Sequence, residues 1–594
     1  MINPMTKYSF ILLNGEQEAL LERLQELGLM DITRNTKTLD SKAQQKLADI
    51  ELVDGLIKGL KKIEVPEGIE PKHLDNTELE RLAGGILMYY SDQSSTLQSL
   101  RKELEARRIW GSFNPEILKE LSEAGVPIHF HRLSNKLFKP EWEQDSALTV
   151  VKKEKANTWF LVIGEDTLPG ELPTPDADAE QLEKTIEEKE KDFHRLLTYV
   201  AGAQQRIPDM EAFKTELCAD LDLYLAGLSA VPAAENTIVT LVGYAPVEDD
   251  ETICAALEEA DVFYLKEEAM VEDNPPIKLK NNWFVKQFEV LTDMYGRPAY
   301  NGFDPTPFIS VFFLLFFAFC MGDCGYGLVL IAIGLLLKKV DSFKDMAPLV
   351  VILGIGTTVI GFLFHTFFSI DIANWEIFQP IKWIFLPAKI GGYDGTMVLA
   401  LIIGIIHLCL AMCVKTYQET RNKGFMNALG TWGWTLLIVG GTAVATLFLL
   451  GVLDKGITKI IVIVIGVLSA LGIFVFNDMK RGKLANVGVG LWNTYNTVTG
   501  LLGDVLSYLR LYALGLAGAM LGMAFNNIGT MVLGDGQSPV LWIPFVLIVI
   551  IGHTLNVAMC ALGAFVHPLR LNFLEFFKNS GYEANGRNFH PLSK

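Results

Sequence analysis

The second half of the sequence contains apolar runs that are long enough to cross a lipid bilayer, and they predict a helical membrane domain. A bilayer's hydrocarbon core is about 30 Å thick, so a helical span needs roughly 20 mainly apolar residues. The runs lie near residues 308–322, 325–337, 346–368, 395–414, 429–452, 458–476, 491–525 and 539–577. The first two are short, and one interrupted helix is an alternative to two. Because Gly322-Asp323-Cys324-Gly325 between them has the residue types of a tight turn, we expect eight spans.

The last two runs are longer than a bilayer requires. At 1.5 Å per residue, an uninterrupted helix over 491–525 would be roughly 52 Å long. We therefore expect the two C-terminal helices to tilt, bend or protrude from the membrane.

Charge separates the chain into an acidic first part and a weakly basic second part. After Phe308 there are 18 Lys and Arg against 13 Asp and Glu, and the other 33 basic and 56 acidic residues precede it, for a net charge of −18. Met1–Leu13 has no charged segment followed by an apolar core and a cleavage site. We therefore expect a cytoplasmic domain over residues 1–300 and a membrane domain over 301–594. The acidic first part also argues against nucleic acid as a partner.

The basic residues between the spans indicate an orientation. With eight spans and a cytoplasmic first domain, the inner connections and the tail hold Lys338, Lys339, Lys344, Lys415, Arg421, Lys423, Lys480, Arg481, Lys483, Lys578, Arg587 and Lys594. The outer connections hold Lys382, Lys389, Lys455 and Lys459. Since basic residues concentrate in cytoplasmic loops, this distribution favours eight spans with both termini in the cytoplasm, whereas seven spans would invert it.

The sequence indicates no metal, cofactor or nucleotide site. Cys218 and Cys254 lie in the first part without the close spacing of a zinc site. The other five cysteines fall in apolar segments, where free cysteine usually behaves as a small hydrophobic residue. The pattern Gly-x-x-x-x-Gly-Lys-Ser/Thr does not occur, so we expect that the chain itself does not hydrolyse ATP.

Two helical arms are predicted in the cytoplasmic domain. Apolar residues recur at helical spacing in a first arm at about 40–124, where they are Leu79, Leu82, Ile86, Tyr90, Leu97, Leu100 and Leu104. A second arm at about 176–228 repeats the pattern with Leu182, Ile186, Phe193, Leu196, Leu197 and Val200. The dense Glu and Lys around the second stripe favour an antiparallel coiled-coil rod, with a helical bundle as the alternative.

Small α/β lobes are expected at the two ends of this rod. The strand-like segments are Lys7–Leu13, Val126–Leu133, Leu148–Ile163 and Thr237–Val242. They predict a distal lobe at about 125–175 and a proximal lobe from 1–38 together with 230–270. The fold class is therefore an α-helical polytopic membrane domain joined to an elongated α+β cytoplasmic domain.

Arg510 lies near the middle of the apolar run 491–525. A guanidinium stays charged in proteins, and its insertion at the centre of a membrane helix costs roughly 2.5–3.5 kcal/mol. An arginine that reaches the headgroups or pairs with a neighbouring carboxylate is the alternative, but a central position makes reaching out difficult. A functional role is therefore the preferred interpretation.

Polar side chains form one stripe on each of the last two predicted helices. On the last helix the stripe is His553, Asn556, Cys560, Gly563, His567 and Arg570. On the preceding helix it is Asn496, Thr499, Gly503, Ser507, Arg510, Leu514 and Ala517. A single intramembrane His or Ser is more often a packing group, but two such stripes facing each other would enclose water.

Several motifs resemble the membrane stator subunit of rotary V-type and A-type ATPases, called subunit a in eukaryotes and subunit I in prokaryotes. The strongest is Gly503-Asp504-Val505-Leu506-Ser507-Tyr508-Leu509-Arg510-Leu511, which is similar to the family's segment around its essential arginine. Others are Gly243-Tyr244-Ala245-Pro246, Asn281-Asn282, Phe288-Glu289, Met294-Tyr295-Gly296, Asp304-Pro305-Thr306-Pro307, Gly322 to Gly327, Gly404-Ile405-Ile406-His407 and His567-Pro568-Leu569-Arg570. The resemblance covers the chain from about residue 240 and the remainder in layout, and the compact length looks prokaryotic.

The resemblance implies a non-catalytic stator that couples H⁺ or Na⁺ translocation to rotation in a prokaryotic cell membrane. Arg510 would meet the carboxylate of a rotor ring of small membrane subunits, favour the ionised acid and block a leak between two aqueous half-channels. The cytoplasmic domain would dock peripheral stalk subunits and so connect indirectly to the soluble ATPase sector. The expected ion-translocation residues are Arg510, Arg570, Ser507, Asp504, His567, His553, Asn556 and His407.

The sequence departs from the eukaryotic pattern at two positions. Eukaryotic relatives carry Glu where this chain has Cys560, and His where it has Gly518. Their access path therefore does not transfer in detail, and His553 with Asn556 is our substitute hypothesis for the outer half-channel. A secondary cation transporter or channel with a cytoplasmic regulatory domain is the alternative function, although the sequence lacks convincing inverted repeats. A purely structural scaffold would not explain Arg510.

Overall fold

A computed structural model of the chain contains two compact units. The first comprises Met1–Leu13, Leu29–Ile32 and Pro232–Pro591, and the second comprises Asn14–Gly28, Thr33–Val231 and Leu592–Lys594. The structure describes residues 1–594 except 14, 35–39, 76–84, 112, 140, 143–146, 155, 165–167, 175–178, 234–236, 261, 341–342, 374, 388, 391, 477–482, 535–538 and 594. The predicted division near residue 300 is not tested by these units and stays a prediction.

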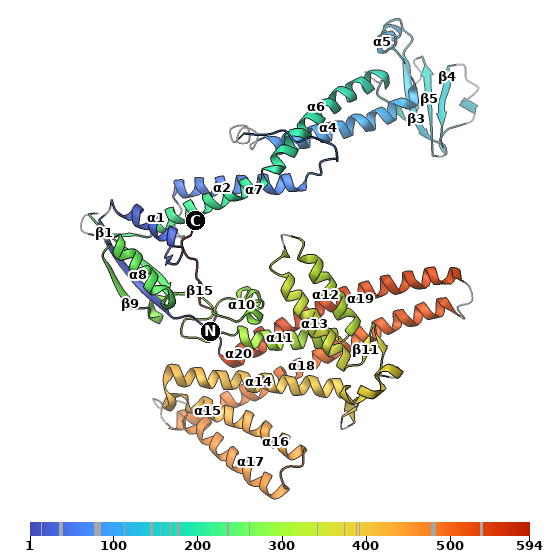
Figure 1. Ribbon diagram of the computed structural model, residues 1–594. Helices are drawn as coiled ribbons and strands as arrows, with labels where there is room; N and C mark the ends of the chain where they lie inside the picture. Colours follow the sequence, from blue (N-terminus) through green and yellow to red (C-terminus); the bar gives the residue numbers. More distant parts are fainter. Residues whose placement is uncertain are drawn as a thin grey trace. The chain divides into compact units, whose positions relative to one another are not determined.

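Paired helices dominate the second unit (Figure 1). Helix α2 (Ser41–Lys62) packs along α7 (Ile207–Leu228), and α4 (Ile86–Arg107) packs along α6 (Ala179–Gln205). Both pairs are antiparallel, because ion pairs join residues early in one helix to residues late in the other. They are Lys46–Asp220, Lys61–Glu211, Arg101–Glu190 and Arg108–Glu183.

Apolar side chains close the seams between these helices. Leu97 of α4 contacts Leu182 and Ile186 of α6. A second cluster lies where α2, α6 and α7 come together, and it contains Leu56, Leu60, Leu196, Val200 and Met210. Charged side chains contact one another at the exposed edge of the α2–α7 pair. Hydrogen bonds from Lys214 and Lys58 lower the pKa of Asp54 to about 2. Paired helices thus occupy the predicted arms, and the coiled-coil geometry stays a prediction. Leu79 and Leu82 lie outside the described residues.

A four-stranded antiparallel sheet forms a lobe of the second unit. Its order is β4 (Leu148–Lys153), β5 (Asn157–Ile163), β3 (Ile128–Ser134) and β6 (Glu171–Leu172). Alternate residues point inward as expected for strands with one buried face, and Leu133, Phe160 and Val162 pack with Phe138. Helix α5 (Pro115–Glu123) precedes β3.

A second sheet belongs to the first unit. Its order is β2 (Asp31–Ile32), β8 (Ile238–Pro246), β1 (Met5–Leu13) and β9 (Tyr264–Glu268). Tyr8 on β1 is fully buried and donates a hydrogen bond of 2.6 Å to Asp250 at the start of α8 (Asp250–Glu259). The strands occur at the predicted segments, so the soluble part contains both helices and sheets.

Five helical segments of the first unit are long and apolar enough to cross a membrane. They are Gly395–Lys423, Phe425–Leu449, Lys455–Val475, Asn486–Leu533 and Trp542–Ser580. The first is α14, and the second contains α15 (Leu429–Thr435) and α16 (Gly441–Leu449) joined by a π-turn at Leu436–Gly440. Helices α17 (Lys455–Ala470), α18 (Lys483–Leu533) and α19 (Trp542–Arg570) follow. The two C-terminal helices are long, as predicted, and their tilt stays a prediction.

Three shorter apolar helices precede these five. They are α11 (Thr306–Met321), α12 (Cys324–Leu337) and α13 (Ala347–Leu363). Gly322 ends α11 with a φ of 52°, and Asp323 caps α12 by accepting hydrogen bonds from the Gly325 and Tyr326 amides. The predicted tight turn is therefore confirmed. The total of eight spans stays a prediction, because length and composition identify five helices among the described residues.

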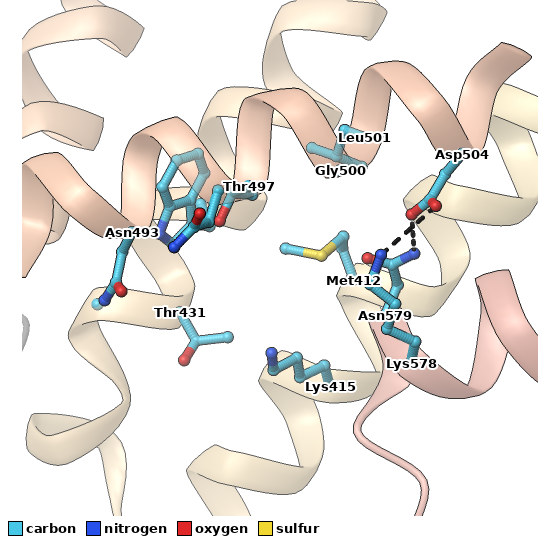
Figure 2. A pocket seen from close by; sticks show the side chains of 13 residues that line it. Met412, Lys415, Thr431, Asn493, Thr497, Gly500, Leu501, Asp504, Lys578 and Asn579 are labelled. Atoms are coloured by element: carbon cyan, nitrogen blue, oxygen red, sulfur yellow. Dashed lines mark hydrogen bonds and ion pairs between the residues drawn. The ribbon is translucent and has the colours of Figure 1, made fainter.

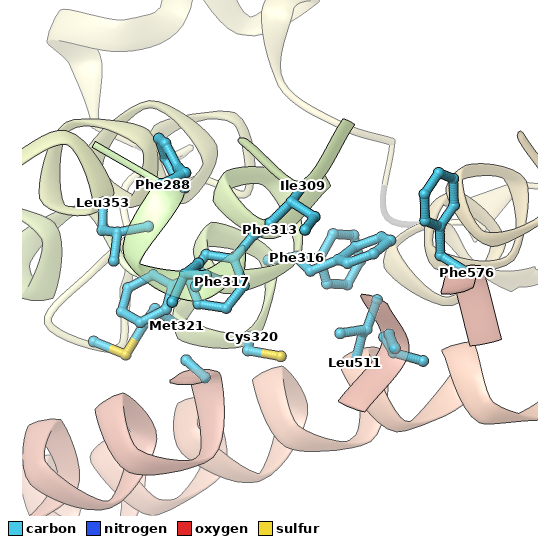
Figure 3. Close-up of a cluster of buried hydrophobic side chains, with 14 of the residues drawn as sticks. Phe288, Ile309, Phe313, Phe316, Phe317, Cys320, Met321, Leu353, Leu511 and Phe576 are labelled. Atoms are coloured by element: carbon cyan, nitrogen blue, oxygen red, sulfur yellow. The ribbon is translucent and has the colours of Figure 1, made fainter. Parts of the chain in front are cut away.

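The core of the first unit surrounds α11 (Figure 3). Phe313, Phe316 and Phe317 of α11 pack among side chains of the neighbouring helices, including Leu353 of α13 and Leu511 of α18. Because Tyr508 and Leu511 are buried in this cluster, the face of α18 that carries them is fixed toward the interior. This packing determines where the other faces of α18 point.

Candidate functional site

Arg510 lies at the edge of the exposed face of α18. Leu502, Leu506 and Met520 on that face are exposed, whereas Arg510 is half-buried. Its Nη1 atom is buried and has no hydrogen-bond partner among the residues that the structure describes. A buried guanidinium nitrogen without a partner is costly, so an acceptor from outside the described residues would stabilise it.

Helix α19 brings two further basic groups toward Arg510. His567 is within electrostatic range of both Arg510 and Arg570. Arg570 is exposed, whereas His567 is half-buried and its Nδ1 atom has no partner within the described part of the chain. The two predicted stripes thus meet at Arg510, His567 and Arg570, and together they would attract an anionic group.

Ser507 and Asp504 lie about one and two turns, respectively, before Arg510 on α18. The Asp504 carboxylate accepts a hydrogen bond of 2.8 Å from Asn579 Nδ2 and lies 3.5 Å from Lys578 Nζ (Figure 2). Ser507 Oγ donates to the Gly503 carbonyl at 3.1 Å. Asp504 therefore connects α18 to α20 (Phe577–Ser580), and the positive charge of Lys578 partly balances its negative charge.

A polar cavity of about 440 Å³ opens beside Asp504 (Figure 2). It is lined on α18 by Asn493, Asn496, Thr497, Gly500, Leu501 and Asp504, and from other helices by Met412, Lys415, Gly430, Thr431, Trp434, Lys578 and Asn579. The predicted stripe residue Asn496 therefore faces a space that can hold water.

A second cavity of about 420 Å³ lies farther along α18, beyond Arg510. Its α18 residues are Tyr512, Gly515, Leu516 and Ala519, and its charged lining includes Lys389 and Asp394. Tyr512 donates a hydrogen bond of 3.1 Å to Asp394. The two cavities contact α18 on either side of residue 510, and this arrangement is not apparent from the helical stripes.

His553 and Asn556 occupy a separate, saturated hydrogen-bond cluster. Asn556 Nδ2 donates to Tyr326 Oη at 2.8 Å and to the Gly518 carbonyl at 2.9 Å. His553 contacts Tyr326 Oη through Nδ1 at 2.8 Å and Asn526 Oδ1 through Nε2 at 2.9 Å. The cluster joins α12, α18 and α19 away from the arginines, although Asn556 borders a small cavity of about 110 Å³ beside Cys560.

His407 is enclosed by aromatic side chains rather than by a cavity. It is fully buried, stacks on Phe576 at 4.8 Å between ring centroids and contacts Phe312 at 4.2 Å. Its Nδ1 atom lies 2.9 Å from Tyr508 Oη. His407 therefore packs α14 against the buried face of α18, opposite to the face that carries Arg510.

Glu575 is a site residue that the helical periodicity did not reveal. A stripe that continues from His567 and Arg570 at α-helical spacing reaches Leu574, which is exposed. The chain instead forms a π-turn over Leu571–Phe576, and this extra residue per turn brings Glu575 inward, where it is 4% exposed. π-turns are frequent at functional sites, and an acidic residue inside an apolar run was the available sequence signal.

No group of three or more His, Cys, Asp and Glu side chains that could hold a metal ion occurs in the part of the chain that is described. The charged groups of α19 near Arg510, His567 and Arg570, are basic side chains, and they would attract an anionic group electrostatically.

The sequence matches the family described as the V-type ATPase 116kDa subunit family over residues 169–378 and 493–594. These ranges include Arg510, Arg570 and Glu575 and cover more than half of the chain. The chain belongs to this family. Its five helices that are long and apolar enough to cross a membrane agree with a multi-pass membrane protein.

Individual relatives carry matching names. The A-type ATP synthase subunit I of Pyrococcus horikoshii is 31% identical over 429 residues, or 69% of this chain and 62% of the relative. That of Methanocaldococcus jannaschii is 30% identical over 59% of this chain and 54% of its own length, so the chain spans less than two thirds of these archaeal relatives. The V-type ATP synthase subunit I 1 of Treponema pallidum is 24% identical over 100% of both chains.

Proposed function

We propose that this chain is the ion-translocating stator of a rotary ATPase membrane sector, with Arg510 facing the carboxylates of a rotor ring. The observation that carries the proposal is the buried Nη1 atom of Arg510, which lacks an acceptor among the described residues and borders the exposed face of α18. An apolar ring packed on that face would place a carboxylate within reach. A cation about 4–6 Å away favours the ionised acid, so each arriving carboxylate releases its H⁺ or Na⁺.

The two cavities along α18 fit the half-channels that this mechanism needs. The cavity at Asp504 would connect to the cytoplasm, and the one at Tyr512 and Asp394 would connect to the outside. Arg510 lies between their α18 residues, and its permanent charge repels a cation that would otherwise pass directly. Ions then cross by riding the ring, which makes rotation obligatory.

Other predicted residues receive more specific proposed roles. His567 and Arg570 extend the positive field of Arg510, and Ser507 hydrates the inner side. His553 and Asn556 support the wall of the outer path, because their hydrogen-bonding groups are used in holding α12, α18 and α19. His407 sets the rotation of α18 through Tyr508.

The soluble part completes the stator. Eight spans would place both termini in the cytoplasm, where the paired helices and lobes dock peripheral stalk subunits and oppose the torque of the ring. The antiparallel pairing of α2 with α7 and of α4 with α6 supports this role, because paired helices resist bending better than single ones.

Replacement of Arg510 by Gln tests the proposal. In inverted vesicles that contain the assembled complex, we expect ATP-driven cation uptake to fall to background while stalk and ATPase subunits still copurify. Arg421→Gln, at the exposed end of α14, is the matched control and should leave uptake unchanged. Uptake by the Arg510→Gln complex at the level of the control would reject the proposal, and so would uptake by the purified chain alone in liposomes.

A further inference from the structure

Glu575 is a buried carboxylate that the mechanism above does not use. The residue is 4% exposed, and its Oε2 atom has no hydrogen-bond partner among the described residues. Ser507 is a hydrogen-bond partner of the carboxylate, so the unpartnered atom is Oε2. Burial of a carboxylate oxygen without a partner is expensive, and buried carboxylates in a membrane domain usually belong to ion pathways. The π-turn at Leu571–Phe576 that places it inward is itself a departure from regular helix.

The surroundings of Glu575 connect the two parts of the proposed site. From α18, Ser507 lies beside its carboxylate, and Asp504 and Tyr508 are within electrostatic range. From its own helix, Arg570 is within the same range, and Arg570 also acts on His567 next to Arg510. Glu575 is therefore linked to Arg510 through Arg570 and His567.

The polar cavity is close to Glu575 along the chain. Lys578 and Asn579, three and four residues after Glu575, line that cavity and hold Asp504. Asn579 Nδ2 also donates to the Glu575 backbone carbonyl at 2.7 Å. One turn of helix thus separates the Glu575 carboxylate, whose Oε2 atom has no partner among the described residues, from the residues that line the cavity.

We propose that Glu575 is the relay carboxylate that transfers the translocated cation between the Asp504 cavity and the ring carboxylate at Arg510. This inference rests on the proposed function. During ATP-driven pumping, an O–H bond of a hydronium ion in the cavity breaks and the proton passes to Glu575 Oε2. The Glu575 O–H bond then breaks and the proton passes, directly or through water, to the ring carboxylate that is leaving Arg510, which restores the Glu575 carboxylate. When the ring turns in the opposite direction, the same steps run in reverse. A sodium ion would follow the same route as a ligand of these oxygens.

A purely structural alternative exists, in which Glu575 only balances the charge of Arg570. The two roles differ in what a neutral isostere does. Glu575→Gln keeps the shape and the hydrogen-bonding atoms but can neither hold a proton nor attract a cation, whereas Glu575→Asp keeps the carboxylate and shortens the side chain.

The experiment compares ATP-driven cation uptake with copurification of the complex in three variants. We expect Glu575→Gln to assemble and to lose about a hundredfold in uptake, as is typical when a positioned proton acceptor is removed. Glu575→Asp should regain a substantial part of the uptake. Glu583→Gln removes an exposed carboxylate after α20 that does not line the Asp504 cavity, so it should transport normally.

Uptake by Glu575→Gln equal to that of Glu583→Gln would overturn the inference, as would equal losses in the Glu575→Gln and Glu575→Asp variants. If Glu575→Gln does not assemble, the Glu575→Asp variant decides the question. A Glu575→Asp complex that assembles and pumps supports the relay, and one that assembles without pumping rejects it. Failure of both variants to assemble rejects the relay in favour of the structural role. Loss of uptake in Arg510→Gln with normal uptake in Glu575→Gln would reject the relay alone. Normal uptake in Arg510→Gln would reject the proposed function itself.

Discussion

The Tyr326 hydroxyl belongs to a chain of hydrogen bonds that connects three helices, α12, α18 and α19. Asn526 Nδ2 donates to the Phe368 carbonyl at 2.9 Å, so its Oδ1 atom faces His553 and accepts from Nε2–H. The other ring nitrogen, Nδ1, then accepts from the Tyr326 hydroxyl, which in turn accepts from Asn556. Each donor in this chain has one acceptor, and the order of the bonds selects a single tautomer of His553.

Removal of the Tyr326 hydroxyl should destabilise the membrane domain. In Tyr326→Phe, the buried Nδ1 atom of His553 loses its donor, and one amide hydrogen of Asn556 loses its acceptor. Such losses cost about 1–3 kcal/mol each, so we expect a lower midpoint of thermal unfolding in detergent. Tyr417→Phe is the control, because Tyr417 is exposed on α14. An equal midpoint for both variants would contradict the structural role assigned to the cluster.

At the level of single residues, the sequence predicts which charged side chains have a role better than it predicts the partners that they contact. Arg510 stands out because a permanent charge in an apolar run has few structural explanations. The pairing of His553 with Asn556 on one helical face is likewise visible, but the partners Tyr326 and Asn526 come from other elements. Glu575 escapes a search by helical periodicity, since the π-turn shifts its register by one residue.

Among the helices, the contact between α14 and α18 depends on Gly404. A Cβ atom at this position would lie 2.4 Å from the Tyr508 ring, which is buried and bonded to His407. Gly404 therefore allows the close approach that fixes the rotation of α18 and hence the direction of Arg510. Small residues have this function at many membrane-helix interfaces.

Substitution of Gly404 by Ala should increase the distance between α14 and α18 at this contact. Overpacking of a buried contact costs about 1–3 kcal/mol, so we expect a lower unfolding midpoint in detergent and reduced ATP-driven uptake. Gly466→Ala on α17 is the matched control, because a Cβ atom there meets nothing within 4 Å. The interpretation of Gly404 as a spacing residue fails if both alanine variants unfold and transport alike.

Elements with a strong local signal were predictable, and those shaped by packing were not. The turn at Gly322 and Asp323 and the strands β1, β3 and β8 follow from turn residues and alternating side chains. The π-turns at Leu436–Gly440 and Leu471–Val475 interrupt apolar runs that look uniform in the sequence. Close helix packing occurs near both π-turns, since a Cβ atom at Gly433 would lie 3.0 Å from the Ser469 carbonyl.

For the whole molecule, the number of membrane crossings determines whether the two termini lie on the same side of the membrane. Helices α11, α12 and α13 have 16, 14 and 17 residues. At 1.5 Å per residue they measure roughly 24, 21 and 26 Å, which is less than a bilayer core of about 30 Å. Their close packing supports a membrane location, since Gly327 meets Thr358 and Gly334 meets Val351 across the α12–α13 interface. Eight crossings place the two termini on one side, and five place them on opposite sides.

Cysteine labelling in a cysteine-free background decides between these topologies. We expect Asp345→Cys and Glu583→Cys to react with a membrane-impermeant thiol reagent only in inverted vesicles, and Lys389→Cys and Asp454→Cys only in right-side-out vesicles. The reason is the concentration of basic residues on one side, which sets the orientation of the chain. With five crossings, α11 to α13 would all remain on one side of the bilayer, and Asp345 and Lys389 would then label in the same vesicles. That result would also place the Asp394 cavity on the wrong side for an outer half-channel, so the labelling pattern tests the arrangement of both ion paths around Arg510.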